Sequence, residues 1–279
     1  MISFDFDYYK PDSIDEAVTL FRSLSSMGKK PMYYAGGTEI ITLGRLNLLY
    51  TNAVIDLKGI SECNILAHNS DTLTIGASLT LAQLGMNHYF PLLANISKEI
   101  ADHTSRLKIT VGGNICGNIF YREAVLPFLL TDSQVLIAGK NGLQKNPINN
   151  VFCKTMQLEN GEFIVQLQTQ SKYIESPFVS IKRRQQWNVG YPLITVNSIK
   201  VENQIRVAIA GLCPFPFRSL KMESMLNRKE LSTEEKVELA IQHLPQPILN
   251  DVEGSDEYRI FVLKNTLLDV VETLEGAGA

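Results

Sequence analysis

The sequence predicts an α+β protein built in two parts, with a change of character near Ser171. Before this residue, helical patterns alternate irregularly with short apolar strands. After it, strand patterns follow one another around a predicted hairpin at Asn203-Gln204, and two helical patterns come last. Grouped strands followed by grouped helices are typical of α+β domains. We therefore expect the second part, residues 172–279, to form a three- or four-stranded antiparallel sheet with helices on one face.

Each element of the first part has a local signal. A capping box at Ser13 and Glu16, followed by apolar residues at helical spacing, predicts a first helix, and Thr80 and Gln83 predict a second helix start. A third helix should begin at Pro91. Strands are expected at Lys30–Gly37, Thr51–Leu57, Leu73–Ser78, Gln134–Gly139 and Glu162–Gln170, the last one half-exposed because its apolar residues alternate, and Ala124–Leu130 should be a buried helical segment.

The second part has helix signals of the same kind. Ser232 and Glu235 form a capping box, and Ser255–Leu274 has the pattern of a long amphipathic helix. The segment Cys213–Phe217, "CPFPF", has two interpretations. It is either part of an interface with another protein or a buried turn, since its two prolines are typical of turns.

Composition excludes several classes of function. The chain has 279 residues, 45% hydrophobic residues and a net charge of −3, which gives no electrostatic footprint for nucleic acid. No apolar run approaches the ~20 residues of a membrane span. The start lacks the charged and apolar regions of a signal peptide, so we expect a cytoplasmic protein.

The cysteines and histidines indicate no metal site. The four cysteines, Cys63, Cys116, Cys153 and Cys213, are scattered, and none forms a CxxC pair or stands at ligand spacing from a histidine. We expect all four to be small buried or half-buried thiols. The four histidines show no paired motif, so we expect each to be a surface or a capping residue.

Two glycine pairs carry the clearest functional signal. Gly36-Gly37 precedes Thr38, and Gly112-Gly113 lies between Thr110 and Asn114. A glycine-rich loop can point several backbone N–H groups at one anion because no Cβ blocks close approach. Two such loops suit a pyrophosphate, whereas a structural turn is the alternative for each. The chain has neither a GxxxxGK[ST] phosphate loop nor a GxGxxG dinucleotide fingerprint after its first strand.

Both loops resemble those of a known family. "YAGGTEII", Tyr34–Ile41, is similar to the first flavin-binding loop of the FAD-binding subunit of molybdenum hydroxylases, which include xanthine dehydrogenase and carbon monoxide dehydrogenase. "IADHTSRLKITVGGNICGN", Ile100–Asn118, resembles the second loop, in which an arginine four residues before a threonine precedes a T-[IV]-GGN signature. Arg106 and Thr110 stand at those positions, and weaker matches extend over nearly the whole chain.

The resemblance implies a fold and a set of site residues. Residues 1–171 would be a two-part FAD-binding domain of the vanillyl-alcohol-oxidase (PCMH) type, with subdomains of about 1–56 and 57–171, and 172–279 a C-terminal flavoprotein domain. FAD would lie extended between the two subdomains. The implied FAD-binding residues are Ala35, Gly36, Gly37, Thr38, Glu39 and Ile40 in the first loop and Thr104, Arg106, Thr110, Gly112, Gly113 and Asn114 around the second.

Two further residues are implied outside the loops. Lys182 matches a family lysine that lies close to the flavin, although a solvated lysine at a strand end is the alternative. Many relatives carry an Ala-Asp pair after the second loop, whose aspartate bonds to the flavin. Here Arg122-Glu123 occupies that stretch, so Glu123 is the candidate, one residue out of register; a surface helix carboxylate is the alternative.

The implied function is that of one subunit in an electron-transfer chain. In this family a substrate is oxidised at a molybdenum centre, and electrons pass through two [2Fe–2S] clusters to FAD and then to NAD or another acceptor. This chain has no cluster-binding cysteine set. The resemblance therefore implies a xanthine dehydrogenase-like oxidoreductase with an iron–sulfur subunit and a molybdopterin-binding subunit as partners, in a two-fold hetero-oligomer. The rivals are a stand-alone FAD-dependent dehydrogenase or oxidase and a non-catalytic nucleotide-binding module.

Overall fold

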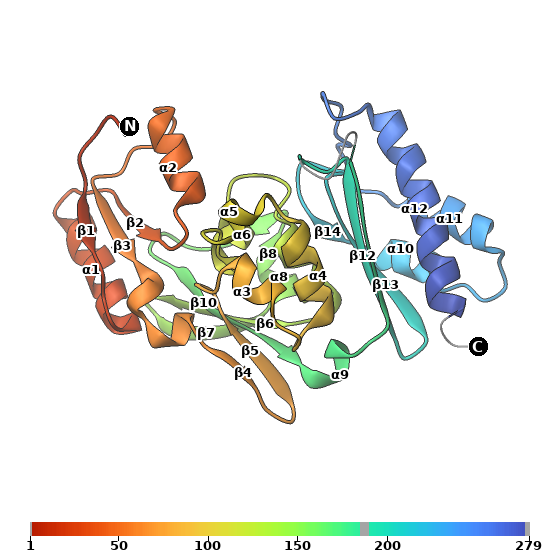
Figure 1. Ribbon diagram of the computed structural model, residues 1–279, viewed down its shortest axis with the longest axis horizontal. Coiled ribbons are helices and arrows are strands. Elements are labelled where there is room, and N and C mark those ends of the chain that lie inside the picture. Colours follow the sequence, from red (N-terminus) through yellow and green to blue (C-terminus); the bar gives the residue numbers. More distant parts are fainter. Residues whose placement is uncertain (1, 185–189, 277–279) are drawn as a thin grey trace.

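The structure, a computed structural model, describes residues 2–184 and 190–276. Its N-terminal segment forms a small parallel sheet at one end of the molecule (Figure 1). The strand order is β1-β3-β2, with β1 (Asp7–Tyr9), α1 (Ile14–Ser26), β2 (Pro31–Tyr34), α2 (Thr38–Arg45) and β3 (Ala53–Asp56). The capping box of α1 is half formed. Ser13 accepts from the Glu16 N–H, but the Glu16 carboxylate accepts from the Asp12 N–H.

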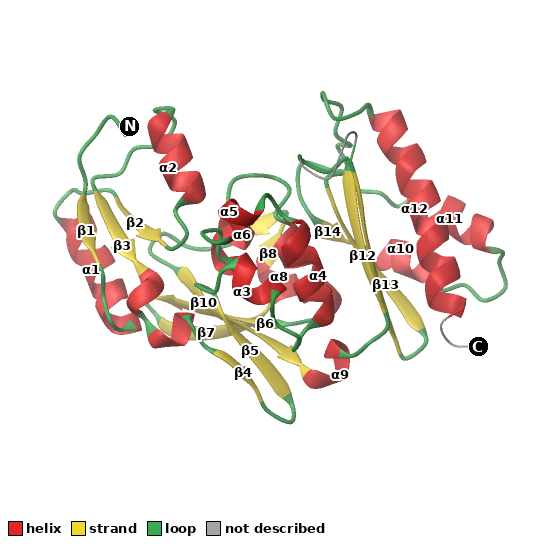
Figure 2. Cartoon of the chain, viewed as in Figure 1, coloured by secondary structure: helices red, strands yellow, loops and turns green. Residues whose placement is uncertain are grey.

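The middle of the chain forms a five-stranded antiparallel sheet with helices packed on it (Figure 2). The strand order is β4-β5-β10-β6-β7, with β4 (Leu66–His68), β5 (Thr72–Gly76), β6 (Gln134–Gly139), β7 (Gly142–Pro147) and β10 (Phe163–Gln170). The helices are α3 (Leu81–Gly85), α4 (Pro91–Glu99), α5 (His103–Arg106), α6 (Val111–Cys116), α7 (Leu126–Leu130), α8 (Ile148–Val151) and α9 (Ser171–Ile174). Single 3-10 turns η1 (Leu57–Gly59), η2 (Ser61–Cys63) and η3 (Glu123–Val125) and a short pair, β8 (Phe152–Cys153) and β9 (Thr155–Met156), complete it.

Strand β10 differs from the prediction that it is half-exposed. It lies in the centre of its sheet, between β5 and β6, and both of its faces are buried. Val165 packs in one core with Phe21 of α1, and Leu167 packs in the larger core under the helices. The alternating pattern was misleading because α1, which is far away in sequence, covers the second face.

The C-terminal part confirms the predicted antiparallel sheet with helices on one face. Four strands pair in the order β11 (Phe178–Arg183), β12 (Ile194–Val201), β13 (Gln204–Ala210) and β14 (Phe217–Arg218), and α10 (Leu220–Leu226), α11 (Thr233–Ile241) and α12 (Asp256–Gly276) pack on the outer face (Figure 1). The hairpin turn consists of Glu202 and Asn203, with φ of 50° and 58°, one residue earlier than predicted. The capping boxes at Thr80/Gln83 and Ser232/Glu235 are both present.

The structure also tests the expectations for the Cys213–Phe217 segment, for the cysteines and for membrane-spanning helices. Cys213, Phe215 and Phe217 are buried in the C-terminal core, so "CPFPF" is a buried turn and not an exposed interface. Cys116 and Cys153 are exposed, contrary to the expectation that all four thiols are buried or half-buried. Among the described residues, no helix is both long and apolar enough to span a membrane.

The inner face of the C-terminal sheet packs against the middle part of the chain. Apolar residues of β12 and β13, among them Ile199 and Ala208, share a core with Leu126 and Phe128 near α7. Ionic contacts reinforce this face. Asp132 accepts from Arg206 and Arg218, each at 2.7 Å.

A buried ion pair joins the same two parts. Lys182 Nζ on β11 donates to Glu123 Oε2 at 2.9 Å and to the Glu99 carbonyl at 2.8 Å. Thr195 of β12 donates to the other Glu123 oxygen at 2.6 Å. The side chains of Lys182 and Glu123 are 6% and 4% exposed. Burial lowers the pKa of Lys182, against the opposing effect of Glu123.

The domain boundaries at 56/57 and 171/172 stay predictions. The strands on the two sides of each boundary belong to separate sheets. The hydrophobic cores, however, include residues from both sides of each boundary. Leu57 and Ile60 pack in the same core as Ala17, and Ile199 packs in the core of the middle part. Residues 185–189, within the stretch that follows Lys182, lie outside the described residues.

Replacing Lys182 should destabilise the fold strongly. In Lys182→Met the Glu123 carboxylate stays buried without its cation, so the free energy of unfolding should fall by about 3–5 kcal/mol. Urea denaturation of the apoprotein measures this. Adding Glu123→Gln should recover much of the loss, because the uncompensated charge is then removed.

The exposed pair Lys140–Glu159, with side chains 60% and 63% exposed, supplies the matched control. Lys140→Met should leave the urea midpoint within error of the wild type, because exposed ion pairs contribute little. A Lys182→Met variant as stable as this control would contradict the prediction.

Candidate functional site

The two glycine pairs, far apart in sequence, meet in space. A Cβ added to Gly36 would lie 2.1 Å from the Lys108 carbonyl oxygen and 3.2 Å from the Thr110 backbone nitrogen. Any side chain at residue 36 would therefore push the loops apart. Gly36 is required because the protein's own second loop approaches it.

The first loop ends a strand and starts a helix. β2 stops at Tyr34, and Gly37, in the left-handed region with φ 69°, is the N-cap of α2. A Cβ on Gly37 would lie 2.3 Å from the Tyr34 hydroxyl oxygen. The first backbone N–H groups of a helix have no partner within the helix. In the described part of the chain, the N–H groups of Thr38, Glu39 and Ile40 donate to no protein acceptor.

Glu39 ties this helix to the segment that follows the second loop. Its carboxylate accepts from the Asn118 N–H at 2.8 and 2.9 Å and from the Ile119 N–H at 3.2 Å. A carboxylate at a helix N-terminus would compete with a bound anion for the same donors. The geometry avoids this, because the Glu39 oxygens are occupied by backbone donors of the other loop.

The second loop runs along the segment after β5. Leu81 N–H donates to the Ile109 carbonyl, Val111 N–H to that of Leu79 and Gly112 N–H to that of Ala77, each at 2.9 Å. A Cβ on Gly112 would lie 2.7 Å from that of Ala77. Gly112 therefore packs against protein, and its N–H is already used.

Gly113 and the half-buried Asn114 form the open side of the second loop, and Thr110, 1% exposed, is buried beside them. Thr110 Oγ1 accepts from the Gly113 N–H at 3.2 Å, and Asn114 Oδ1 accepts from the Ala124 N–H at 3.1 Å. Neither the Thr110 hydroxyl hydrogen nor Asn114 Nδ2 is donated to a protein acceptor within 2–184 and 190–276. Gly113 is exposed, and the one neighbour of a Cβ there would be Thr110 Oγ1 at 2.8 Å. The loop thus has one side-chain donor at a partly exposed position, Asn114 Nδ2, and one that is buried, the Thr110 hydroxyl.

Arg106 has a structural use before this loop. Its guanidinium donates to the carbonyl oxygens of Ile100 and Ala101 at 3.2 and 2.6 Å, which braces the connection between α4 and α5. Thr104 is exposed on α5. The structure therefore places both residues just before the second loop, and within the described residues neither side chain has a hydrogen bond to the first loop.

Glu123 and Lys182 lie together, but in the interface between the two parts of the chain. Their burial excludes the alternatives of a surface helix carboxylate and a solvated lysine. A cleft of about 370 Å³ adjoins them, and its lining includes Glu99 of α4, Ser180 of β11 and Thr195 of β12. The pair is therefore next to a space that is large enough for part of a ligand.

Sequence reasoning missed Arg122. It is 4% exposed, has φ of 32°, and donates to the carbonyl oxygens of Gly117 at 2.5 Å, Lys154 at 3.1 Å and Asn118 at 3.3 Å. Burial lowers its pKa. Glu39 holds the N–H of Asn118 while Arg122 holds its carbonyl, so this segment is fixed from both sides. The neighbouring Glu123 could be identified as a candidate from the sequence, but no sequence pattern indicates that an arginine will be buried.

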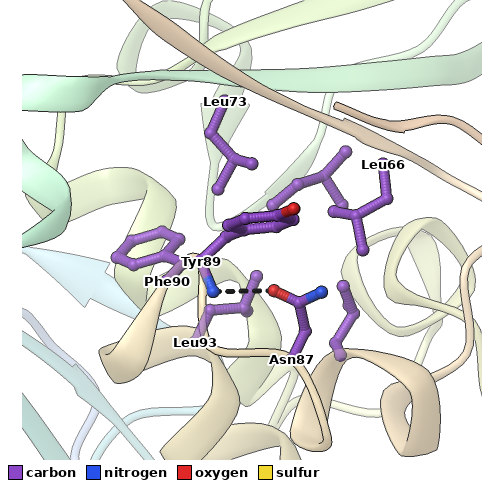
Figure 3. A pocket seen from close by; sticks show the side chains of 8 residues that line it. Leu66, Leu73, Asn87, Tyr89, Phe90 and Leu93 are labelled. Carbon is purple, nitrogen blue, oxygen red and sulfur yellow. Dashed lines mark hydrogen bonds between the residues drawn. The ribbon is translucent and has the colours of Figure 1, made fainter. Parts of the chain in front are cut away.

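A second gap in the structure is too small for a cofactor. It lies under the α3–α4 connection, and its lining includes Leu66, Leu73 and Tyr89 (Figure 3). Its volume is about 10 Å³, which is space for roughly one water molecule. The described part of the chain also holds no cluster of histidine, cysteine or acidic residues that suits a metal ion.

The loop geometry fits a dinucleotide with a pyrophosphate. Unpaired N–H groups at the start of α2 form an anion site, which the helix dipole favours. Across the Gly36 contact, Thr110 and Asn114 add neutral donors. The contact of the two loops brings these groups to one region of the molecule.

Comparison with known proteins identifies the family. Residues 4–169 match the family described as FAD binding domain in molybdopterin dehydrogenase. The medium chain of carbon monoxide dehydrogenase from Hydrogenophaga pseudoflava is 26% identical over 244 residues, 84% of either chain. The FAD-subunit of nicotinate dehydrogenase from Eubacterium barkeri is 24% identical over 153 residues, 53% of this chain and 51% of that one.

Solved structures agree on the fold. Carbon monoxide dehydrogenase from Hydrogenophaga pseudoflava gives a TM-score of 0.88 at 21% identity, covering 99% of both chains. Quinoline 2-oxidoreductase from Pseudomonas putida 86 gives 0.85 at 20% identity, with the same coverage. These matches confirm the predicted α+β fold with its FAD-binding domain of the PCMH type. The chain belongs to the family of FAD-binding domains of molybdopterin dehydrogenases, and its cofactor is FAD.

Proposed function

We propose that this chain is the FAD-carrying electron-transfer subunit of a xanthine dehydrogenase-like molybdenum hydroxylase. It takes electrons from two [2Fe–2S] clusters of a partner subunit and passes them to NAD or another acceptor. A third subunit with molybdopterin oxidises the substrate, and the complex is a two-fold hetero-oligomer in the cytoplasm. The observation that carries this proposal is the direct contact of two loops whose donors face one region.

The names of the relatives support a subunit. They are a medium chain, a subunit beta and an FAD-subunit, and this chain covers 84% of the length of the first. Such names belong to single chains of larger enzymes. The activity of the present chain is inferred from them together with the site.

In this proposal the two loops contribute different groups to FAD binding. The N–H groups of Thr38, Glu39 and Ile40 hold the pyrophosphate, with Ala35, Gly36 and Gly37 shaping their approach. Thr110, Gly112, Gly113 and Asn114 form the opposite wall, and Thr104 and Arg106 support it. FAD supplies the capacity to accept and release electrons. Glu123 and Lys182 define the charge of the cleft between the two parts.

FAD should be bound without a covalent bond. The proposed contacts are hydrogen bonds from backbone and side-chain donors, which break when the chain unfolds. After acid precipitation, the flavin absorbance should therefore appear in the supernatant. Flavin that stays with the precipitated protein would contradict the prediction.

Gly113→Val should weaken FAD binding more than it weakens the fold. The added side chain stands on the open surface of the second loop, where a ligand would approach. Loss of one hydrogen bond to a charged group lowers affinity about ten- to a hundredfold. Titration of the apoprotein with FAD, followed by fluorescence quenching, measures the change.

The control for this variant is Gly276→Val, since a Cβ there meets no neighbouring atom within 4 Å, whereas at Gly113 it meets Thr110 Oγ1 alone. Its affinity for FAD should equal that of the wild type. Gly37→Val is a poor probe, because the positive φ and the Tyr34 contact would strain the fold itself. Wild-type affinity in Gly113→Val would remove the second loop from the site.

The chain should purify as part of a complex. From its native host at endogenous level, it should co-elute with an iron–sulfur protein and a molybdopterin protein, detected by metal analysis and mass spectrometry. If it elutes alone and sustains turnover of a small alcohol or hydroxy acid, the stand-alone dehydrogenase replaces the proposal.

A further inference from the structure

Lys58 contacts the first glycine loop from behind. Its Nζ donates to the carbonyl oxygen of Ala35 at 2.8 Å and to both oxygens of Asp56, at 2.7 and 2.8 Å. The same ammonium lies over the Tyr34 ring, 4.6 Å from its centroid. The Lys58 ammonium thus joins Tyr34 and Ala35, at the end of β2, to Asp56, at the end of β3.

Asp56 is itself held in place. It is 3% exposed, accepts from the Lys58 N–H at 3.0 Å and accepts from the Tyr8 hydroxyl. The hydrogen bond to Asp56, helped by burial, raises the pKa of Tyr8 to about 12. The phenol therefore keeps its proton and remains a donor at neutral pH. The Lys58 ammonium is thus fixed by a buried carboxylate, although Lys58 itself is partly exposed.

The position of the Ala35 carbonyl has a consequence for Gly36. In a planar trans peptide the C=O and N–H groups point in opposite directions. With its carbonyl on Lys58, the Ala35–Gly36 peptide directs the Gly36 N–H away from β3. This N–H donates to no protein acceptor in the described residues. The Tyr34 ring, under the same ammonium, packs against Gly37.

We propose that Lys58 is a positioning residue, which orients the Ala35–Gly36 peptide so that the Gly36 N–H joins the donors of α2 at the FAD pyrophosphate. The inference rests on the proposed function of the first loop. Lys58 acts through the peptide and does not itself bind phosphate. The Asp56 carboxylate, bonded through both oxygens, neutralises its charge.

The test compares Lys58→Met and Lys58→Arg in the full chain. Lys58→Met keeps the length of the side chain but loses the donor, so FAD affinity should fall about tenfold. Lys58→Arg keeps a cationic donor and should restore most of the affinity. Binding of riboflavin, which has no phosphate, should not change in either variant. Circular dichroism melting of each apoprotein checks that the fold is intact.

The matched control is Lys30→Met. Lys30 also lies over a tyrosine ring, that of Tyr50 at 5.9 Å, in the same N-terminal part, and in the described residues its ammonium has no hydrogen bond to the loop. Its FAD affinity should be that of the wild type. Lys58→Met leaves the Asp56 carboxylate unpaired, so the salt dependence is compared in the double variant Lys58→Met/Asp56→Asn, which keeps the net charge beside the loop. The salt dependence of FAD binding should be the same in this double variant and in the wild type, because screened attraction depends on that net charge.

Each of the other outcomes of these titrations contradicts either the positioning role of Lys58 or the proposed site itself. Wild-type FAD affinity in Lys58→Met, while Gly113→Val loses affinity, overturns the positioning role and leaves the proposed site intact. Wild-type affinity in both variants removes the loops themselves from the site. Equal losses for FAD and riboflavin, failure of Lys58→Arg, or a weaker salt dependence in Lys58→Met/Asp56→Asn each overturn the inference, since they indicate a general structural role or direct phosphate binding.

Discussion

The contact between Gly36 and the backbone of the second loop is the constraint on which the site depends. It joins main chain to main chain, with space for a hydrogen atom and nothing larger at residue 36. A spacing set by backbone atoms cannot relax by rotamer changes, unlike one set by side chains. Glu39 and Arg122 then hold the segment around Asn118 to the same frame. The donors of both loops are therefore held in place by contacts within the protein.

The C-terminal sheet is attached by a mixture of apolar and ionic contacts. Ile199 and Ala208 bury apolar surface against the middle part, and such burial is strong but has no preferred direction. The bonds among Glu123, Lys182 and Thr195 have fixed geometry. The apolar residues therefore supply most of the attraction, and the polar cluster specifies how the sheet lies on α4 and α7.

Local signals made much of this fold predictable. The boxes at Thr80 and Ser232 and the hairpin near Asn203 depend on neighbours a few residues away, and they were located within one residue. Burial was harder to predict. The second face of β10 is covered by α1, and no periodicity within β10 indicates a distant helix.

The same division holds for the site. The glycine loops were visible because backbone freedom has a residue signature, although Gly36 and Gly112 prove to be required by contacts within the protein. The burial of Glu123, the arginine at residue 122 and the lysine at residue 58 depend on tertiary contacts. A charged residue in a sequence is by default a surface residue, so such positions are found from the fold.

The shared core of the middle and C-terminal parts has a consequence for the solubility of fragments. Ile199, Val201, Ala208 and Ala210 come from the C-terminal sheet but are buried with Leu126 and Phe128. A fragment that ends at residue 171 would expose the apolar surface that these residues cover, together with the unpaired Glu123. Exposed apolar patches of this kind promote aggregation. The match of the family to residues 4–169 therefore marks a unit of homology, whereas the unit that covers this apolar surface is the longer chain.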